Sequence, residues 1–203
     1  TNEIKRMGKI ATENLEKSME AFMKKDQSMI DDVLYTEREI DFLSRKITDY
    51  LVGICQSIPI SEVKNIAGYY HVVNDIERIG DHAENFHEIG VEMAGKRLVF
   101  SEKAQGGIRT MRENVMEMFT ITRKAFTDQD RQQLHQLDVL ENNVDGMKKD
   151  MIARHFARLA EGNCSVDVSP YYSSVIVGLE RVADHLVNVA YSIDNPLGDQ
   201  TEE

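Results

Sequence analysis

The sequence predicts an all-α protein made of two pseudo-repeated antiparallel three-helix bundles that lie side by side. First, the chain of 203 residues contains 41% hydrophobic residues and only 3 Pro, which favours a globular protein built from long helices. Second, apolar residues recur at helical spacing along most of the chain. Third, the segment YYHVVNDIERIGDHAENFHEI (69–89) is largely repeated 103 residues later as YSSVIVGLERVADHLVNVAY (172–191).

The first unit is expected to contain three helices. The first covers Thr1 to about Lys25 and the second Asp26 to about Ser57, because apolar residues return every three or four positions in both. Pro59 should end the second helix, since proline cannot continue the helical hydrogen bonding. Ser61 is then the expected N-cap of the third helix, which should fade between Gly90 and Gly95.

The second unit is expected to follow the same order. Ser101 should cap the fourth helix, and the fifth should run from Leu134 to about Leu159. A loop is expected over Glu161–Pro170, and the sixth helix carries the second copy of the repeated segment. The tail from Asp194 is expected to fray.

A second match indicates where the two units divide. EAFMKKD (20–26) resembles KAFTDQD (124–130), 104 residues later, so the repeat includes the helices that precede the 69–89 segment. The chain is therefore predicted to consist of a first three-helix repeat, residues 1–98, and a second, residues 99–203.

The composition limits the partners and the compartment. The net charge of −11 argues against a nucleic acid or an anionic membrane surface as the main partner and suits a protein that collects cations. Cys55 and Cys164 are the only cysteines and occupy non-equivalent places, so a reducing, cytoplasmic setting without a disulfide framework is expected. No run approaches 18 uninterrupted apolar residues, so no membrane-spanning segment is expected in this chain.

Each unit carries two Glu-x-x-x-Asp motifs, and residues four apart share one face of a helix. One such motif carries little weight, because 35 acidic residues should produce about six of these spacings by chance. Four such motifs at matching positions of the two repeats carry more weight. The residues are Glu37, Asp41, Glu77 and Asp81 in the first unit and Glu141, Asp145, Glu180 and Asp184 in the second.

The spacing of the motifs predicts that they meet across a helical hairpin. In the first unit Glu37 and Asp81 lie equally far along the chain from Pro59, and so do Asp41 and Glu77. In the second unit the two corresponding pairs lie equally far from the point between Gly162 and Asn163. Both helices of an antiparallel pair rise by the same amount per residue. Four carboxylates should therefore gather at one level in each hairpin.

Clustered carboxylates repel one another unless some take up protons or share a positive ion. An all-oxygen site suits hard cations such as Mg²⁺, Ca²⁺, Mn²⁺ or iron better than structural zinc. The alternative is an exposed acidic surface compensated by water and by nearby basic side chains. Those side chains would be Arg78, Arg181, Lys46 and Lys148.

Polar residues beside the motifs turn away from the carboxylate face. Arg78 and Arg181 each follow a glutamate by one residue, and His82 and His185 each follow an aspartate by one. One residue corresponds to about 100° around a helix, so we expect these side chains to orient neighbouring groups rather than to be the main ligands.

Arrangements typical of enzymes are incomplete. A ferritin-like di-iron site needs a Glu-x-x-His motif on each of two helices. Glu84 and His87 form one such motif, but Val187 and Ala190 stand at the corresponding places of the second unit. No Ser-His-Asp or Cys-His arrangement stands out, so the sequence predicts no catalytic residue and no enzyme. A carboxylate-bridged di-metal enzyme or metal phosphohydrolase is a lesser alternative, and a structural helical adaptor is a third.

The segments ERIGDHAEN (77–85) and ERVADHLVN (180–188) resemble the signature of the PhoU domain family, and the resemblance extends over essentially the whole chain. It implies a tandem pair of three-helix bundles whose carboxylate motifs bind multinuclear metal clusters. The metal would be iron, zinc or nickel, and manganese and magnesium are further candidates. It implies that the four carboxylates of each unit form one cluster, with Asn85 and Asn188 beside them.

The resemblance also implies a non-enzymatic regulatory domain in phosphate uptake. The segment PISEVKNIAGYYHVV (59–73) departs from the Ala-x-Asp-Leu-Arg-like segment of free-standing PhoU proteins, and the chain begins at Thr1 without Met. Both features favour the PhoU-like cytoplasmic domain of a Na⁺/phosphate cotransporter, at the inner face of the cell membrane. The partner would be the membrane domain of a phosphate transporter, in cis or in trans, and a homodimer is left open. The alternative is a free-standing PhoU-type repressor of phosphate ABC transport and signalling.

Overall fold

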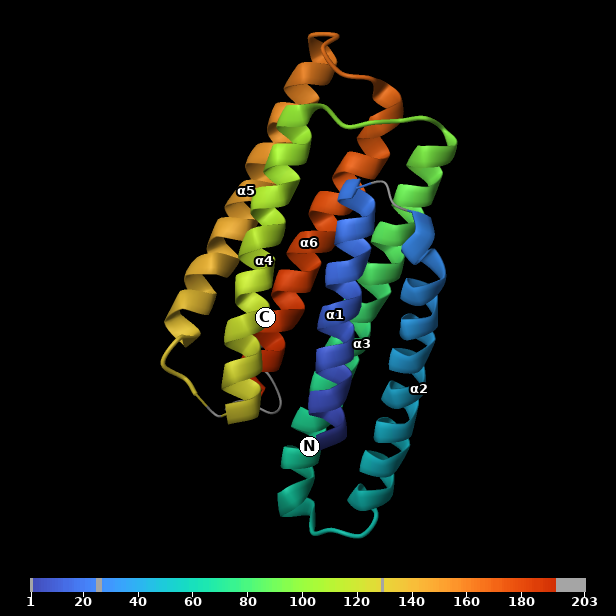
Figure 1. The fold of residues 1–203 in the computed structure, drawn as a ribbon. Coiled ribbons are helices and arrows are strands. Elements are labelled where there is room, and N and C mark those ends of the chain that lie inside the picture. The colour runs from blue at the N-terminus through green and yellow to red at the C-terminus, as the bar shows by residue number, and fades with distance from the viewer. Residues whose placement is uncertain (1, 25–26, 129, 193–203) are drawn as a thin grey trace.

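The structure is a computed structural model that describes residues 2–24, 27–128 and 130–192. Its described residues form six long helices and no strand, so the all-α prediction is confirmed (Figure 1). The helices are α1 (Asn2–Lys24), α2 (Ile30–Cys55), α3 (Ile60–Gly95), α4 (Glu102–Asp128), α5 (Leu134–Ala160) and α6 (Ser169–Tyr191). Short 3-10 turns at Gln27–Met29 and Val166–Val168 precede α2 and α6.

The starts of α3 and α6 differ in detail from the expected ones. The N-cap of α3 is Pro59, in an extended conformation with φ −62° and ψ 147°, so the predicted cap at Ser61 was wrong. Proline suits this position because its fixed φ matches the extended cap and its missing N–H is not needed there. Ser101 does cap α4, since its Oγ accepts a hydrogen bond of 3.3 Å from the Ala104 N–H. Helix α6 begins at Ser169 with Pro170 in its first turn, so the loop before it is shorter than expected.

Three further expected positions lie outside the described residues. They are the start of the first helix at Thr1, the junction at Lys25 and Asp26, and the tail from Asp194.

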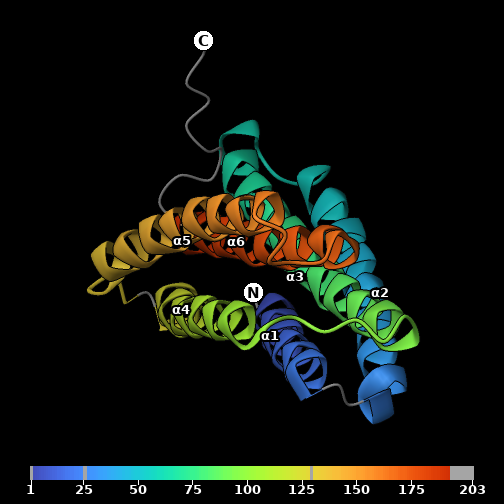
Figure 2. The ribbon, with the colours of Figure 1, turned by 90° about the horizontal axis from the view of Figure 1, so that it is seen from above.

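The helices form two three-helix groups that meet along α3 and α6. Helix α1 packs on α2 and α3, and α4 packs on α5 and α6. Figure 2 shows α2, α3, α6 and α5 following one another in a row, with α1 and α4 together on one face of it. The predicted boundary between residues 98 and 99 falls in the connection between α3 and α4. It stays a prediction, because one continuous hydrophobic core runs through both groups.

A buried hydrogen bond occurs at equivalent places in both groups. Ser18 Oγ donates to the Ala83 carbonyl at 2.5 Å, and Thr122 Oγ1 donates to the Leu186 carbonyl at 3.2 Å. Ser18 and Thr122 are 104 residues apart, and Ala83 and Leu186 are 103 apart. A buried hydroxyl needs such a partner, so each bond fixes how the first helix of a group sits on the third.

The turns of the two hairpins place the carboxylate motifs. Cys55 and Ile60 bound the turn between α2 and α3, while Gly162 follows α5 with a φ of 72°, a conformation that favours glycine.

None of the helices in the described part of the chain is long and apolar enough to cross a membrane. Cys55 and Cys164 are both free thiols.

Candidate functional site

The eight predicted carboxylates lie on the two helical hairpins. Glu37 and Asp41 lie on α2, and Glu77 and Asp81 lie on α3; we call this group, together with the adjacent Glu84, the first cluster. The second cluster has two members on each of α5 and α6. They are Glu141, Asp145, Glu180 and Asp184.

Glu37 is the most strongly perturbed group of the first cluster. Its side chain is buried, with 5% of the residue exposed, and among the described residues neither of its carboxylate oxygens has a hydrogen-bond partner. Burial raises the pKa of Glu37 to about 8, and the negative charges of Asp81, Asp41, Glu84 and Glu77 add to the effect. An ionised Glu37 therefore lies beneath other carboxylates with no positive group against it, a costly arrangement.

The outer members of the first cluster are held by Arg78. Its Nη1 donates to Asp81 Oδ2 at 3.1 Å, and its Nε lies 3.8 Å from Glu77 Oε2. Burial still raises the pKa of Glu77 and of Asp81, while Arg78 opposes the rise in both. Burial and the charge of Glu88 likewise raise the pKa of Glu84. Arg78 thus compensates the rim of the cluster and leaves Glu37 beneath it uncompensated.

Gly80 provides the space that Glu37 occupies. A Cβ atom at this position would lie 2.7 Å from Glu37 Oε2 and 3.2 Å from two side-chain atoms of Ile40. The carboxylate therefore fills the place of a side chain on α3. At the equivalent place in the second unit the residue is Ala183, and the counterpart of Glu37, Glu141, is only partly buried.

The second cluster contains its own cation, Lys148. Its Nζ donates to Glu180 Oε1 and lies 3.8 Å from Asp145 Oδ1, and Glu180 is 8% exposed. The equivalent residue in the first unit is Ser44. Burial, followed by the charges of neighbouring carboxylates, raises the pKa of Glu141 and of Asp184.

The basic side chains considered in the sequence behave differently. Arg181 lies 4.0 Å from Glu180, and Arg78 and Lys148 pair with carboxylates as described above. Lys46 instead lies over the ring of Phe42, 5.7 Å from its centroid. Basic side chains therefore neutralise part of the negative charge of the two clusters, but these four leave Glu37 without a positive partner.

A contact between the two units joins the neighbourhoods of the clusters. His185 Nδ1 lies 2.8 Å from Asp75 Oδ1, and Asn188 Nδ2 donates to the same oxygen at 3.4 Å. The rings of His82 and His185 are 6.1 Å apart, and burial lowers the pKa of His82 to about 4. The sequence analysis missed Asp75, because its counterpart in the repeat is Gly178 and the motif gave no signal there.

The remaining polar residues of the sequence motifs lie less centrally. Asn85, the counterpart of Asn188, is exposed. Glu84 acts electrostatically on Glu37, whereas His87 lines a small apolar cavity of about 60 Å³ with Phe22. Glu84 and His87 therefore face different surroundings, which agrees with discounting the Glu-x-x-His motif.

The carboxylates gather, but they do not form a finished coordination shell. Within the described ranges, no group of three or more His, Cys, Asp or Glu side chains is arranged to hold a metal ion directly. The feature of the first cluster that fits a cation is the pair of buried Glu37 oxygens, which no group in the described part of the chain satisfies. The second cluster has no such orphan among its carboxylates and has Lys148 in place of an ion.

Comparison with known proteins gives two matches to one family model. The model of the PhoU domain matches residues 4–89 and again residues 108–193. These two ranges correspond to the two three-helix groups.

Curated relatives match nearly the full chain. A phosphate-specific transport system accessory protein PhoU homolog of Clostridium acetobutylicum is 25% identical over 197 residues, which cover 94% of this chain and 87% of that protein. The corresponding homolog 1 of Thermotoga maritima is 23% identical over 194 residues, covering 95% of this chain and 83% of the relative.

Solved structures share the fold. PhoU from Pseudomonas aeruginosa superposes with a TM-score of 0.85 at 20% identity, covering 95% of this chain and 92% of that one. The phosphate transport system regulatory protein PhoU from Streptococcus pneumoniae gives a TM-score of 0.83 at 16% identity, covering 100% and 95%. At these identities the structural likeness bears on the fold alone.

Proposed function

Because this chain belongs to the PhoU domain family, we propose that it is a regulatory accessory protein of phosphate uptake. The curated relatives, named as accessory proteins of a phosphate-specific transport system, support this proposal. They favour the free-standing PhoU-type reading over the cotransporter domain that the 59–73 segment suggested. The partner in this proposal is a phosphate transporter, met at the cytoplasmic face of the membrane, and the chain acts on it without catalysing a reaction.

We further propose that the first cluster binds a metal ion. The single observation that carries this proposal is Glu37, a buried carboxylate with two unsatisfied oxygens among other carboxylates. Glu37, Asp41, Glu77 and Asp81 would hold the ion, and carboxylate oxygens suit magnesium, manganese or iron. When bound, the ion supplies positive charge that offsets the repulsion between α2 and α3.

The second cluster is proposed as the weaker site. Lys148 already neutralises part of its charge, and an ion would have to displace that ammonium group from Glu180. The two clusters would therefore differ in affinity although the sequence motif is the same.

Metal content and thermal stability test the first cluster. The purified protein should carry metal, and chelation at neutral pH should lower its melting temperature. An ion at 100 times its Kd stabilises by about 2.7 kcal/mol, and each kcal/mol is worth roughly 2–4 °C for a chain of this size. The expected fall is therefore about 5–10 °C.

The matched control is Glu37→Gln, which should carry less metal and respond less to the chelator. If wild type and Glu37→Gln contain equal metal and melt alike with and without chelator, Glu37 does not hold a metal ion. The hypothesis of a structural helical adaptor with an acidic surface would then be favoured.

The role in phosphate uptake is tested in cells. Deleting the gene should make phosphate uptake insensitive to external phosphate, and the wild-type gene should restore the response. Uptake that responds normally in the deletion strain would contradict the proposed regulatory role, whatever metal the protein binds.

A further inference from the structure

An apolar cavity lies away from both carboxylate clusters, where α1 and α4 run side by side over α3 and α6. Its volume is about 250 Å³. Helices α1 and α4 pack mainly on α3 and α6 and touch each other little, which leaves room between them. The lining residues on α3 and α6 are Ile76, Ile79, Leu186 and Val189.

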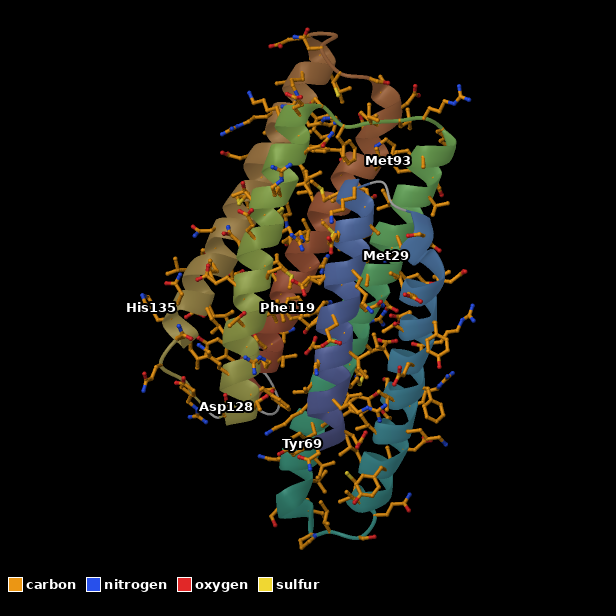
Figure 3. All side chains as sticks on the ribbon, in the orientation of Figure 1. Met29, Tyr69, Met93, Phe119, Asp128 and His135 are labelled. Atoms are coloured by element: carbon orange, nitrogen blue, oxygen red, sulfur yellow. The ribbon has the colours of Figure 1, made fainter. Side chains whose placement is uncertain are left out.

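The walls of the cavity are apolar and belong to the buried core. Ile4 and Ala11 on α1 and Phe119 and Phe126 on α4 line it, and each is at most 8% exposed. In the view of Figure 3, Phe119 lies between the ribbons of α4 and α1. Apolar walls of this kind favour apolar ligands.

The lining of the cavity is basic where it reaches solvent, at the exposed Lys9 and Arg123, and we call this part of the lining its mouth. Lys5, Lys9 and Arg123 line it, in a chain whose net charge is −11. Lys5 Nζ donates to the Thr127 carbonyl at 2.9 Å, so its ammonium group links α1 to α4 at the opening. Lys9 lies 3.7 Å from Glu13, and both side chains of that pair are mostly exposed, so the pairing is weak.

We propose that this cavity binds a single-chain alkyl carboxylate, with its tail between α1 and α4 and its carboxylate at Lys5, Lys9 and Arg123. The apolar walls select the tail, and the three cations select an anionic head. A 150 Å³ apolar cavity accepts benzene, so by simple scaling 250 Å³ takes a chain of about ten carbons. A lipid with two long chains exceeds that space, and a cationic amphiphile would meet like charge at the mouth.

This site is independent of the proposed metal site and of the role in phosphate uptake. None of the carboxylates of either cluster lines the cavity. The binding of an alkyl carboxylate can therefore fail or succeed whatever the metal content proves to be.

A chain-length series tests the size of the cavity. Hexanoate, octanoate, decanoate and dodecanoate are titrated below their micelle concentrations by isothermal calorimetry. Affinity should rise by roughly fourfold per added methylene while the tail is buried and should level off near decanoate, at one ligand per chain. Affinity that rises as steeply from decanoate to dodecanoate as at shorter lengths, or several ligands per chain, would mean non-specific adsorption and would overturn the proposal.

Filling the cavity tests its position. A Cβ atom at Gly8 would be in ordinary contact with Ile76, 3.6 Å from its Cδ1, so Gly8→Leu should place its longer side chain in the cavity. Decanoate should then bind at least tenfold more weakly. Gly53→Leu is the matched control, because Gly53 is also helical and has no atom within 4 Å of its added Cβ. Equal decanoate affinity in both variants would contradict the proposal.

Removing one charge tests the mouth without altering the walls. Lys5→Met keeps the apolar stem and loses the ammonium group, so decanoate should bind roughly tenfold more weakly while decanol is unaffected. Lys17→Met, at an exposed position of α1 outside the cavity, should change neither. A loss for decanol as large as that for decanoate would show that the variant merely distorts the site.

Phosphatidylglycerol vesicles separate a free ligand from a membrane surface. Vesicles without added decanoate should leave the protein unbound. Firm binding to vesicles, together with no saturable binding of decanoate, would assign the basic mouth to a membrane surface and overturn the proposal.

Discussion

In the first cluster Arg78 pairs with the outer carboxylates Glu77 and Asp81 and leaves the buried Glu37 uncompensated, whereas the second cluster holds Lys148 against its buried carboxylate Glu180 and against Asp145. Two single-residue differences account for this. Gly80 opens a space for Glu37 that Ala183 closes in the second unit, and Ser44 stands where the second unit has Lys148. A duplicated motif can thus keep its carboxylates and still yield one hairpin with an uncompensated buried glutamate and one whose buried glutamate pairs with a lysine.

The largest expected effect is the pH dependence of the metal-free protein. The pKa of Glu37 is about 8 in the folded state, against 4.5 ordinarily, so its contribution to stability is full at low pH and is lost as pH rises through 8. The slope approaches 1.4 kcal/mol per pH unit, or about 4 kcal/mol between pH 5 and pH 8. Urea unfolding across this range measures it.

Glu37→Gln should remove most of that pH dependence, and Glu141→Gln should leave most of it in place because Glu141 is only partly buried. An equal loss of slope in the two variants would mean that the clusters are electrostatically alike.

Removal of the internal cation should have the next largest effect. Lys148→Met leaves the nearly buried Glu180 with only the long contact of 4.0 Å to Arg181, at a cost of about 2–3 kcal/mol in the free energy of unfolding. Part of that loss should return on adding a divalent cation, since the second cluster then resembles the first. Lys149→Met is the control, because Lys149 is 74% exposed and pairs only with Asp145. Calorimetric melting of the two variants with and without metal measures both effects. A loss of stability in Lys148→Met that metal does not reduce would show that the second cluster without its lysine does not behave like the first.

Exchange of the small residues should have an intermediate effect. Gly80→Ala forces Glu37 and Ile40 to move and should cost about 1–3 kcal/mol, with weaker metal binding. The converse change, Ala183→Gly, should cost only the roughly 0.5–1 kcal/mol of a helical glycine. Urea unfolding and metal analysis of the two variants check this. Metal binding that survives Gly80→Ala unchanged would show that Glu37 does not need the space at Gly80.

The smallest expected effect concerns the link between the units. Asp75→Asn weakens the contact with His185 and should cost about 1 kcal/mol. A double-mutant cycle with His185→Gln measures the coupling between the two side chains. No coupling in the cycle would mean that the contact contributes nothing to how α3 and α6 dock.

Much of the site's layout follows from the sequence, because it depends on positions along single helices. The 3.6-residue period puts Glu77 and Asp81 on one face of α3, and the turn at Pro59 sets α2 and α3 antiparallel. Even the wrong cap at Ser61 misplaced the start of α3 by only two residues.

The sequence by itself determined the all-α fold, the six helices and the presence of matched carboxylates in two hairpins, since periodicity, proline and repeat register are local properties. Tertiary structure alone decided which glutamate is buried, which lysine reaches a carboxylate, that Asp75 meets His185 and that a cavity separates α1 from α4. The physical reason is that burial and pairing depend on the distance between helices far apart in sequence. That distance depends on small residues such as Gly80, Ala183 and Gly178, whose role no motif indicated.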